Sequence, residues 1–122
     1  MKRLLKLLIM ALLKTKILIG GNSLDVDELP NGQGEFGLEK TNPVPTNTPE
    51  GSEAYLRRLR TLDGKPIKFS RIGSCGVGLF PGQLIDGYSI RSDSGEMLPT
   101  LWLNMYHKRN SNKAPKGFYL AE

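Results

Sequence analysis

The sequence predicts an α+β fold: a small antiparallel sheet of three or four strands with one or two helices packed on one face. Two local patterns support this class. Apolar residues recur at helical spacing between residues 49 and 62, and apolar and polar residues then alternate in several short segments. Turn residues separate these segments, and a chain of 122 residues is the usual size of one domain.

The helix is predicted to begin near Pro49, with Thr48 as its N-cap. We expect it to end before Asp63, where an Asp-Gly pair signals a turn. Its apolar face is predicted from four residues at helical spacing, namely Tyr55, Leu56, Leu59 and Leu62.

Three strands are predicted where apolar side chains occur at every second position. The apolar positions are Ile67 and Phe69 in the first, Tyr88 and Ile90 in the second, and Leu101, Leu103 and Met105 in the third. Residues 93–96 are expected to join the second and third strands as a hairpin, with Pro99 at the start or edge of its strand. Residues 118–120 are expected to add a short edge strand.

The sequence before the helix is divided into two parts. Residues 1–20 are predicted to form an amphipathic basic helix that docks on its own domain, lies on a membrane surface, or serves as an export signal. Residues 21–48 are predicted to be a loop-rich acidic connection, anchored by Phe36, Leu38 and Val44 if it is ordered. The α+β core is then expected over residues 49–122.

Charge is distributed in blocks along the chain. The net charge is +5, but residues 1–20 carry +5, residues 21–53 carry −6 and residues 54–122 carry +6. If the acidic block lies against one of the basic blocks, little positive field remains for an outside partner.

One cysteine and one histidine limit the chemistry. An intrachain disulfide and a zinc site of the usual type are excluded, and no metal or cofactor is predicted. Cys75 lies in a glycine-rich run, residues 72–78, and would be a nucleophile if His107 reached it as a base. The alternative is a flexible connection between strands, in which Cys75 is a small buried or incidental side chain.

Basic side chains form a second candidate site. Trp102 and Tyr106 are predicted to share one sheet face, and aromatic residues flanked by cations can stack single-stranded bases. The alternative is a solvated charged face with a helix packed over these aromatics. The candidate nucleic-acid contacts are Arg57, Arg58, Arg60, Lys68, Arg71, Lys108, Arg109 and Lys113.

Several short motifs between residues 40 and 120 resemble a family of small uncharacterised bacterial proteins of unknown function. These motifs include Asn42-Pro43-Val44-Pro45, Arg71-Ile72-Gly73-Ser74, Asp86-Gly87-Tyr88, Met105-Tyr106-His107 and Ala114-Pro115-Lys116-Gly117-Phe118. The resemblance implies a bacterial origin in the cytoplasm or cell envelope, but no activity.

No catalytic constellation is evident, so the sequence favours a non-catalytic protein-interaction or accessory module with an unknown protein partner. A nucleic-acid-binding module is the alternative, and a Cys/His-dependent enzyme is the third hypothesis. A cytoplasmic location is expected, with export or membrane association through residues 1–20 as the alternative.

Overall fold

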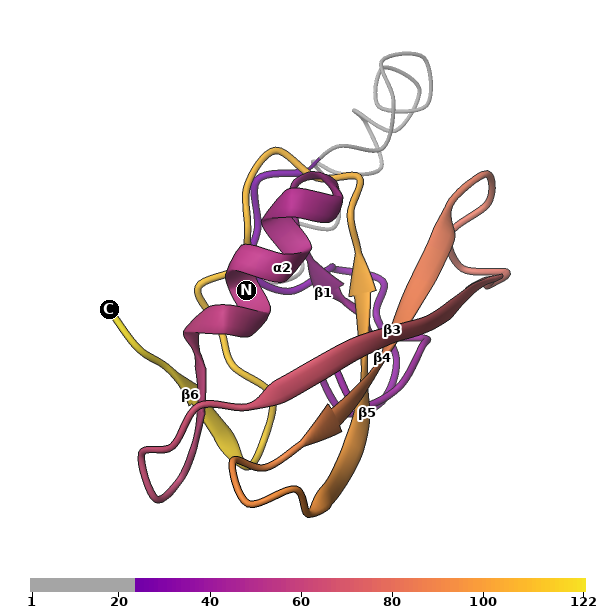
Figure 1. Cartoon of the computed structure of the whole chain (residues 1–122). Helices are drawn as coiled ribbons and strands as arrows, with labels where there is room; N and C mark the ends of the chain where they lie inside the picture. The colour runs from indigo at the N-terminus through magenta and orange to yellow at the C-terminus, as the bar shows by residue number, and fades with distance from the viewer. Residues whose placement is uncertain (1–23) are drawn as a thin grey trace.

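A computed structural model describes residues 24–122, which form an α+β fold around a four-stranded sheet (Figure 1). The strands lie in the order β1-β5-β4-β3. The bounds are β1 Val44–Pro45, β3 Lys68–Gly76, β4 Leu84–Arg91 and β5 Met97–Asn104. Strands β3, β4 and β5 are antiparallel, as predicted.

The sheet is mixed rather than wholly antiparallel, because β1 runs parallel to β5. A two-residue strand lacks a periodic pattern, so β1 was not predicted. A second, two-stranded sheet is also present, in which β2 (Leu59–Thr61) pairs antiparallel with β6 (Phe118–Leu120). The predicted short strand at residues 118–120 is therefore confirmed, with β2 as its partner.

One helix, α2 (Thr48–Arg58), is present in the described part of the chain. Asn47 precedes it as the cap residue and makes no side-chain capping bond. Thr48, the predicted cap, is instead the first helical residue, although its Oγ1 accepts a hydrogen bond from the Gly51 N–H at 3.3 Å. Pro49 lies in the first turn, as predicted, where a missing N–H costs nothing.

The predicted helix is too long at its C-terminal end. Leu59 has extended dihedral angles, φ −71° and ψ 140°, and begins β2. Leu59 is fully buried, but it reaches the core from a strand. Leu62 lies beyond β2 with 75% of its surface exposed, so its assignment to the buried face was wrong.

The flexible connection considered for residues 72–78 begins only after Gly76, because residues 72–76 complete β3. Gly73 has φ 147°, and the register with β4 shifts between Arg71 and Gly73. A bulge at this position bends the strand without ending it. Pro99 lies inside β5, next to a second register shift opposite Ser89. The pairing of the two strands is irregular there, so the sheet tolerates a residue without a backbone N–H.

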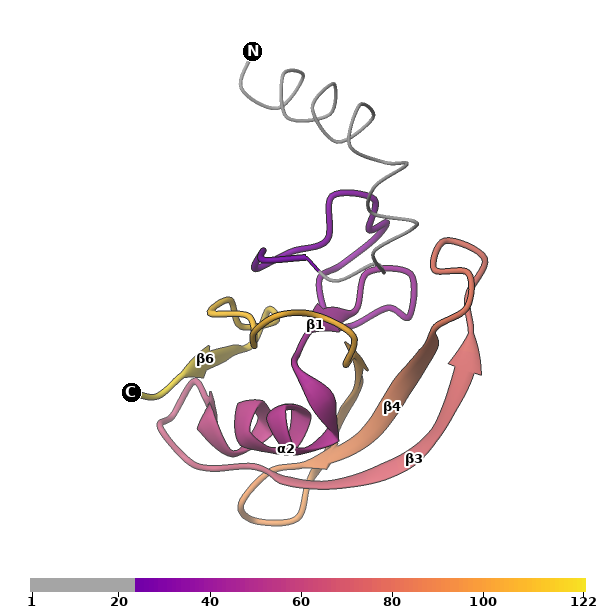
Figure 2. The same cartoon turned by 90° about the horizontal axis from the view of Figure 1, so that it is seen from above.

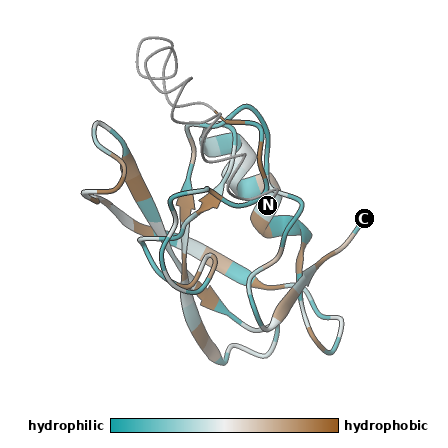
Figure 3. Cartoon of the chain, turned by 180° about the vertical axis from the view of Figure 1, so that it is seen from behind, coloured by the Kyte–Doolittle hydropathy of each residue, from teal (hydrophilic) through white to brown (hydrophobic). Residues whose placement is uncertain are grey.

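The main core lies between α2 and the sheet, and Figure 2 shows α2 inside the curve of β3 and β4. Leu101 and Leu103 face this core, as predicted, whereas Met105 follows the end of β5. Trp102 packs into a second cluster with Ile85. Because neighbouring side chains on a strand point to opposite faces, both faces of the sheet carry apolar clusters. Figure 3 shows apolar and polar residues interspersed along the strands.

The segment before β1 packs against the rest of the fold. Phe36 and Val44 are buried in the main core and Leu38 packs against it, which confirms the three predicted anchors. Leu29 belongs to the second cluster. The helix predicted for residues 1–20 lies outside the described residues. Among residues 24–122, no helix has the length and apolar character needed to cross a bilayer.

Candidate interaction surface

The basic C-terminal segment lies against the acidic segment near residue 25. Arg109 forms ion pairs with Asp25 and with Asp27, the latter at 2.7 Å. Lys113 pairs with Glu28 and lies over the Phe36 ring, 4.8 Å from its centroid. Arg109 and Lys113, two of the eight candidate nucleic-acid contacts, are therefore paired with the acidic segment, an arrangement that the charge blocks allowed.

Asp27 is the centre of this contact. Its Oδ1 also accepts a hydrogen bond from the Asn112 N–H at 2.8 Å, and its carbonyl accepts one from the Ser111 hydroxyl at 2.6 Å. The hydrogen bonds from Arg109 and then Asn112 lower the pKa of the Asp27 carboxyl. These interactions hold the segment around Asp27 against the segment that follows β5.

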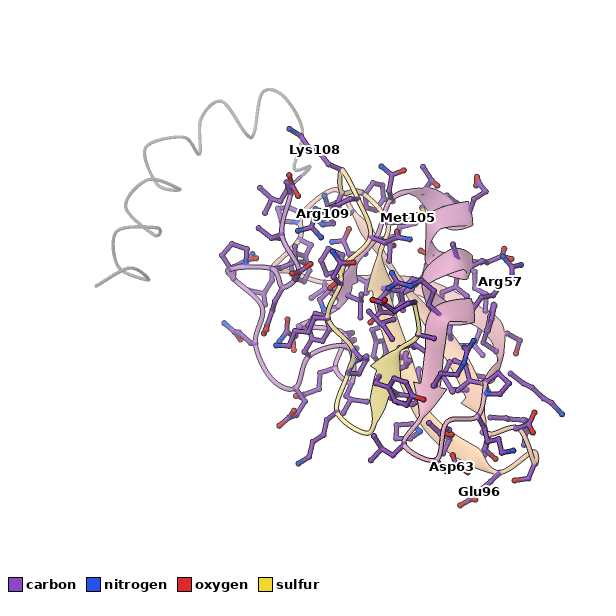
Figure 4. All side chains as sticks on the ribbon, turned by 90° about the vertical axis from the view of Figure 1, so that its left-hand side faces the viewer. Arg57, Asp63, Glu96, Met105, Lys108 and Arg109 are labelled. Carbon is purple, nitrogen blue, oxygen red and sulfur yellow. The ribbon has the colours of Figure 1, made fainter. Side chains whose placement is uncertain are left out.

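The arginines of the helix region make local contacts. Arg57 pairs with Glu53 at 2.9 Å, Arg58 donates to the Ala121 carbonyl at 3.0 Å, and Arg60 donates to the carbonyls of Arg57 and Leu59. Figure 4 shows Arg57 pointing away from α2, far across the view from Lys108 and Arg109. The predicted cations therefore do not form one continuous patch.

The two candidate aromatic residues are not an open stacking platform. The Trp102 ring lies over Gly87 on β4, where an added Cβ would come within 2.8 Å of the ring. Tyr106 follows the end of β5, and its hydroxyl accepts a hydrogen bond from the Leu84 N–H at 3.3 Å. Loop residues, including Val26 and Leu79, pack in the cluster with Trp102. Within residues 24–122, the segments that pack against Trp102 are loops and strands rather than a helix.

His107 is buried and has a structural partner. Its Nδ1 accepts a hydrogen bond from the Leu24 N–H at 3.1 Å, and its Nε2 is buried without a partner among the described residues. Burial lowers the pKa of the imidazole to about 4. The Nδ1 lone pair therefore already accepts the Leu24 N–H and is not available to take a proton from Cys75. This weighs against the Cys75–His107 hypothesis.

Cys75 lies on β3 opposite Ile85, half-buried and without a hydrogen bond to His107. Within residues 24–122, no group of three or more His, Cys, Asp or Glu side chains is arranged to hold a metal ion.

The feature of this surface that sequence analysis missed is the open edge of β3. This strand is nine residues long, about 30 Å at the usual rise, and among residues 24–122 it pairs only with β4. Figures 1 and 2 show β3 on the outside of the sheet. An edge strand presents unpaired N–H and C=O groups along its free side. The other edge strand, β1, has only two residues.

Side chains along β3 give this edge a basic and partly apolar character. Arg71 pairs with the buried Asp86 at 3.1 Å. Burial and the nearby Asp86 charge raise the pKa of Tyr88, which lies opposite Arg71 in the ladder. Ile72, at the bulge, is 59% exposed. Lys68 is exposed at the start of the strand.

The glycines at residues 73, 76 and 78 suggested a loop, so the second half of β3 was not predicted from the sequence. The alternation of Ile67 and Phe69 marked only its first half. No protein-family model, curated protein or solved structure matches this chain.

Proposed function

We propose that this chain is a non-catalytic protein-interaction module that binds an extended segment of a partner protein along β3. The observation that carries the proposal is the free edge of a nine-residue strand. An extended segment added to such an edge completes the backbone hydrogen bonds that β3 leaves unmade.

The geometry of the sheet supports an added strand. The antiparallel β4 holds β3 along its length, and α2 supports the sheet from inside its curve through the main core. A rigid edge avoids the entropy cost of ordering the receptor strand when a partner binds. The exposed Ile72 offers one apolar contact to a side chain of the bound segment.

A second copy of this chain is a poorer occupant of the same edge. Pairing β3 with β3 in parallel would place Lys68 of one copy beside Lys68 of the other, where like charges repel. Charged residues and a bulge are devices by which proteins discourage such self-pairing. A partner of different sequence avoids this repulsion.

The proposal is tested by panning a phage-displayed library of random nonapeptides against the immobilised full chain. The enriched peptides are synthesised and titrated into 15N-labelled chain. We expect the shifted amide resonances to fall within residues 68–76. Methylating the peptide amides that face β3 should weaken binding at least about tenfold, because two or more hydrogen bonds are lost. Methylating the intervening amides, which point away, serves as the control.

The proposal is wrong if no peptide is enriched over the bare support. It is equally wrong if the enriched peptides shift amides of α2 or the C-terminal segment while β3 stays unchanged. A labelled 20-nucleotide single-stranded DNA tests the alternative function in parallel. Binding of that DNA with an affinity that falls steeply with salt, in the absence of peptide binding, would favour the nucleic-acid hypothesis.

A further inference from the structure

We infer that the segment received by β3 is acidic and places a carboxylate beside Lys68. This inference rests on the proposed function and names the chemistry of the partner. It derives from a pair of like charges in the β3–β4 ladder, where Lys68 lies directly opposite Arg91.

Two cations directly opposite each other on one sheet face destabilise the pairing of their strands. Both Lys68 and Arg91 are exposed, and neither forms an ion pair with another residue of the described chain. The Arg91 guanidinium donates to the Gly95 carbonyl at 3.2 Å. No direct ion pair within residues 24–122 therefore offsets the repulsion between Lys68 and Arg91.

A third strand alongside β3 supplies the missing charge. Its side chain next to Lys68 lies on the same face as Lys68 and Arg91, because neighbouring strands share their side-chain alternation. A carboxylate there attracts both cations. The other cation of β3, Arg71, already pairs with Asp86, so Lys68 is the cation of this strand that lacks an ion pair within residues 24–122.

The experiment compares two nonapeptides of one sequence, selected on the full chain, that differ only in carrying Glu or Gln at the position next to Lys68. Their dissociation constants are measured by fluorescence anisotropy against the wild-type chain, against Lys68→Glu, and against Lys116→Glu. Lys116 is an exposed lysine in the C-terminal segment and forms no ion pair among the described residues, so this variant is the matched control for net charge.

We expect the Glu peptide to bind the wild-type chain at least about threefold more tightly than the Gln peptide, as cross-strand charge pairs do. Lys68→Glu should abolish or invert this preference, whereas Lys116→Glu should keep it. Equal affinities for both peptides on the wild-type chain, with β3 amides still shifted, would overturn the acidic-partner inference and leave strand addition intact. Peptides that leave β3 amides unshifted would overturn strand addition itself.

Discussion

Acidification below pH 6.5 is expected to destabilise the fold through His107. The imidazole is buried and neutral, and its Nδ1 accepts the Leu24 N–H. Protonation would replace this acceptor with a donor and place a charge in a buried site. Burial, which disfavours the charged form, lowers the folded-state pKa to about 4, below the ordinary value of 6.5.

The sign and size of the effect follow from linkage. Between pH 6.5 and about 4 the unfolded chain binds a proton that the folded chain rejects, so the free energy of unfolding falls as the pH falls through this window. A pKa difference of one corresponds to ~1.4 kcal/mol, so the whole window is worth up to ~3 kcal/mol. Below pH 4, protonation of Asp27 adds a further loss, because its pKa is also lowered in the folded state.

The assay is urea unfolding followed by circular dichroism at several pH values between 7.5 and 4.5. His107→Asn is the informative variant, because an amide oxygen can accept the Leu24 N–H and does not titrate. We expect a steep loss of stability below pH 6.5 in the wild type and a nearly flat profile in the variant. The reasoning is refuted if the wild type is equally stable at pH 7 and pH 4.5, or if both proteins lose stability in parallel.

Two substitutions test the packing of the sheet and the helix. Gly87→Ala is expected to lower the free energy of unfolding by ~1–3 kcal/mol and to shift the fluorescence of Trp102, because the new Cβ would lie 2.8 Å from the ring. Gly76→Ala is the control, because a Cβ at Gly76 would have no atom within 4 Å. Equal effects of the two substitutions would contradict this packing. Tyr55→Phe is expected to cost ~1 kcal/mol in urea unfolding, because the buried hydroxyl donates to a backbone carbonyl at 2.7 Å. The exposed Tyr119→Phe should change stability by less than ~0.5 kcal/mol, and a loss as large as that of Tyr55→Phe would contradict the assignment.

Local patterns predicted the elements that local chemistry determines. Pro49 lies in the first turn of α2, and residues 93–96 form the expected hairpin, in which the Ser92 N–H donates to the Glu96 carbonyl at 2.8 Å. Alternation placed Leu101 and Leu103 on the core face. In each case the decisive residues are neighbours in sequence, so periodicity and turn residues carry the information.

The elements that were missed depend on contacts between distant residues. The parallel pairing of Val44 with Leu103 joins segments with no shared local signal. Leu59 continues the helical apolar spacing, yet it leaves the helix to pair with Leu120. The glycines in β3 lower its intrinsic strand propensity, but the backbone hydrogen bonds that it forms with β4 outweigh this loss.

For the candidate site, sequence analysis identified the charges but not their partners. The acidic block of residues 21–53 suggested that it could neutralise some of the positive charge. In the structure, Arg109 and Lys113 form ion pairs with Asp27 and Glu28 of this block. The free edge of β3 could not be predicted, because the order of strands in a sheet is set by packing rather than by periodicity.

Amide hydrogen exchange along β3 tests the central claim most directly. In dilute solution of the monomer, every second amide of residues 68–76 should exchange rapidly, because it points away from β4, while its neighbours are protected. Amides of β4, which pairs with β3 on one side and β5 on the other, should be protected throughout its paired length. Uniform protection along β3 in the monomer would show that this edge is already occupied and would contradict the account.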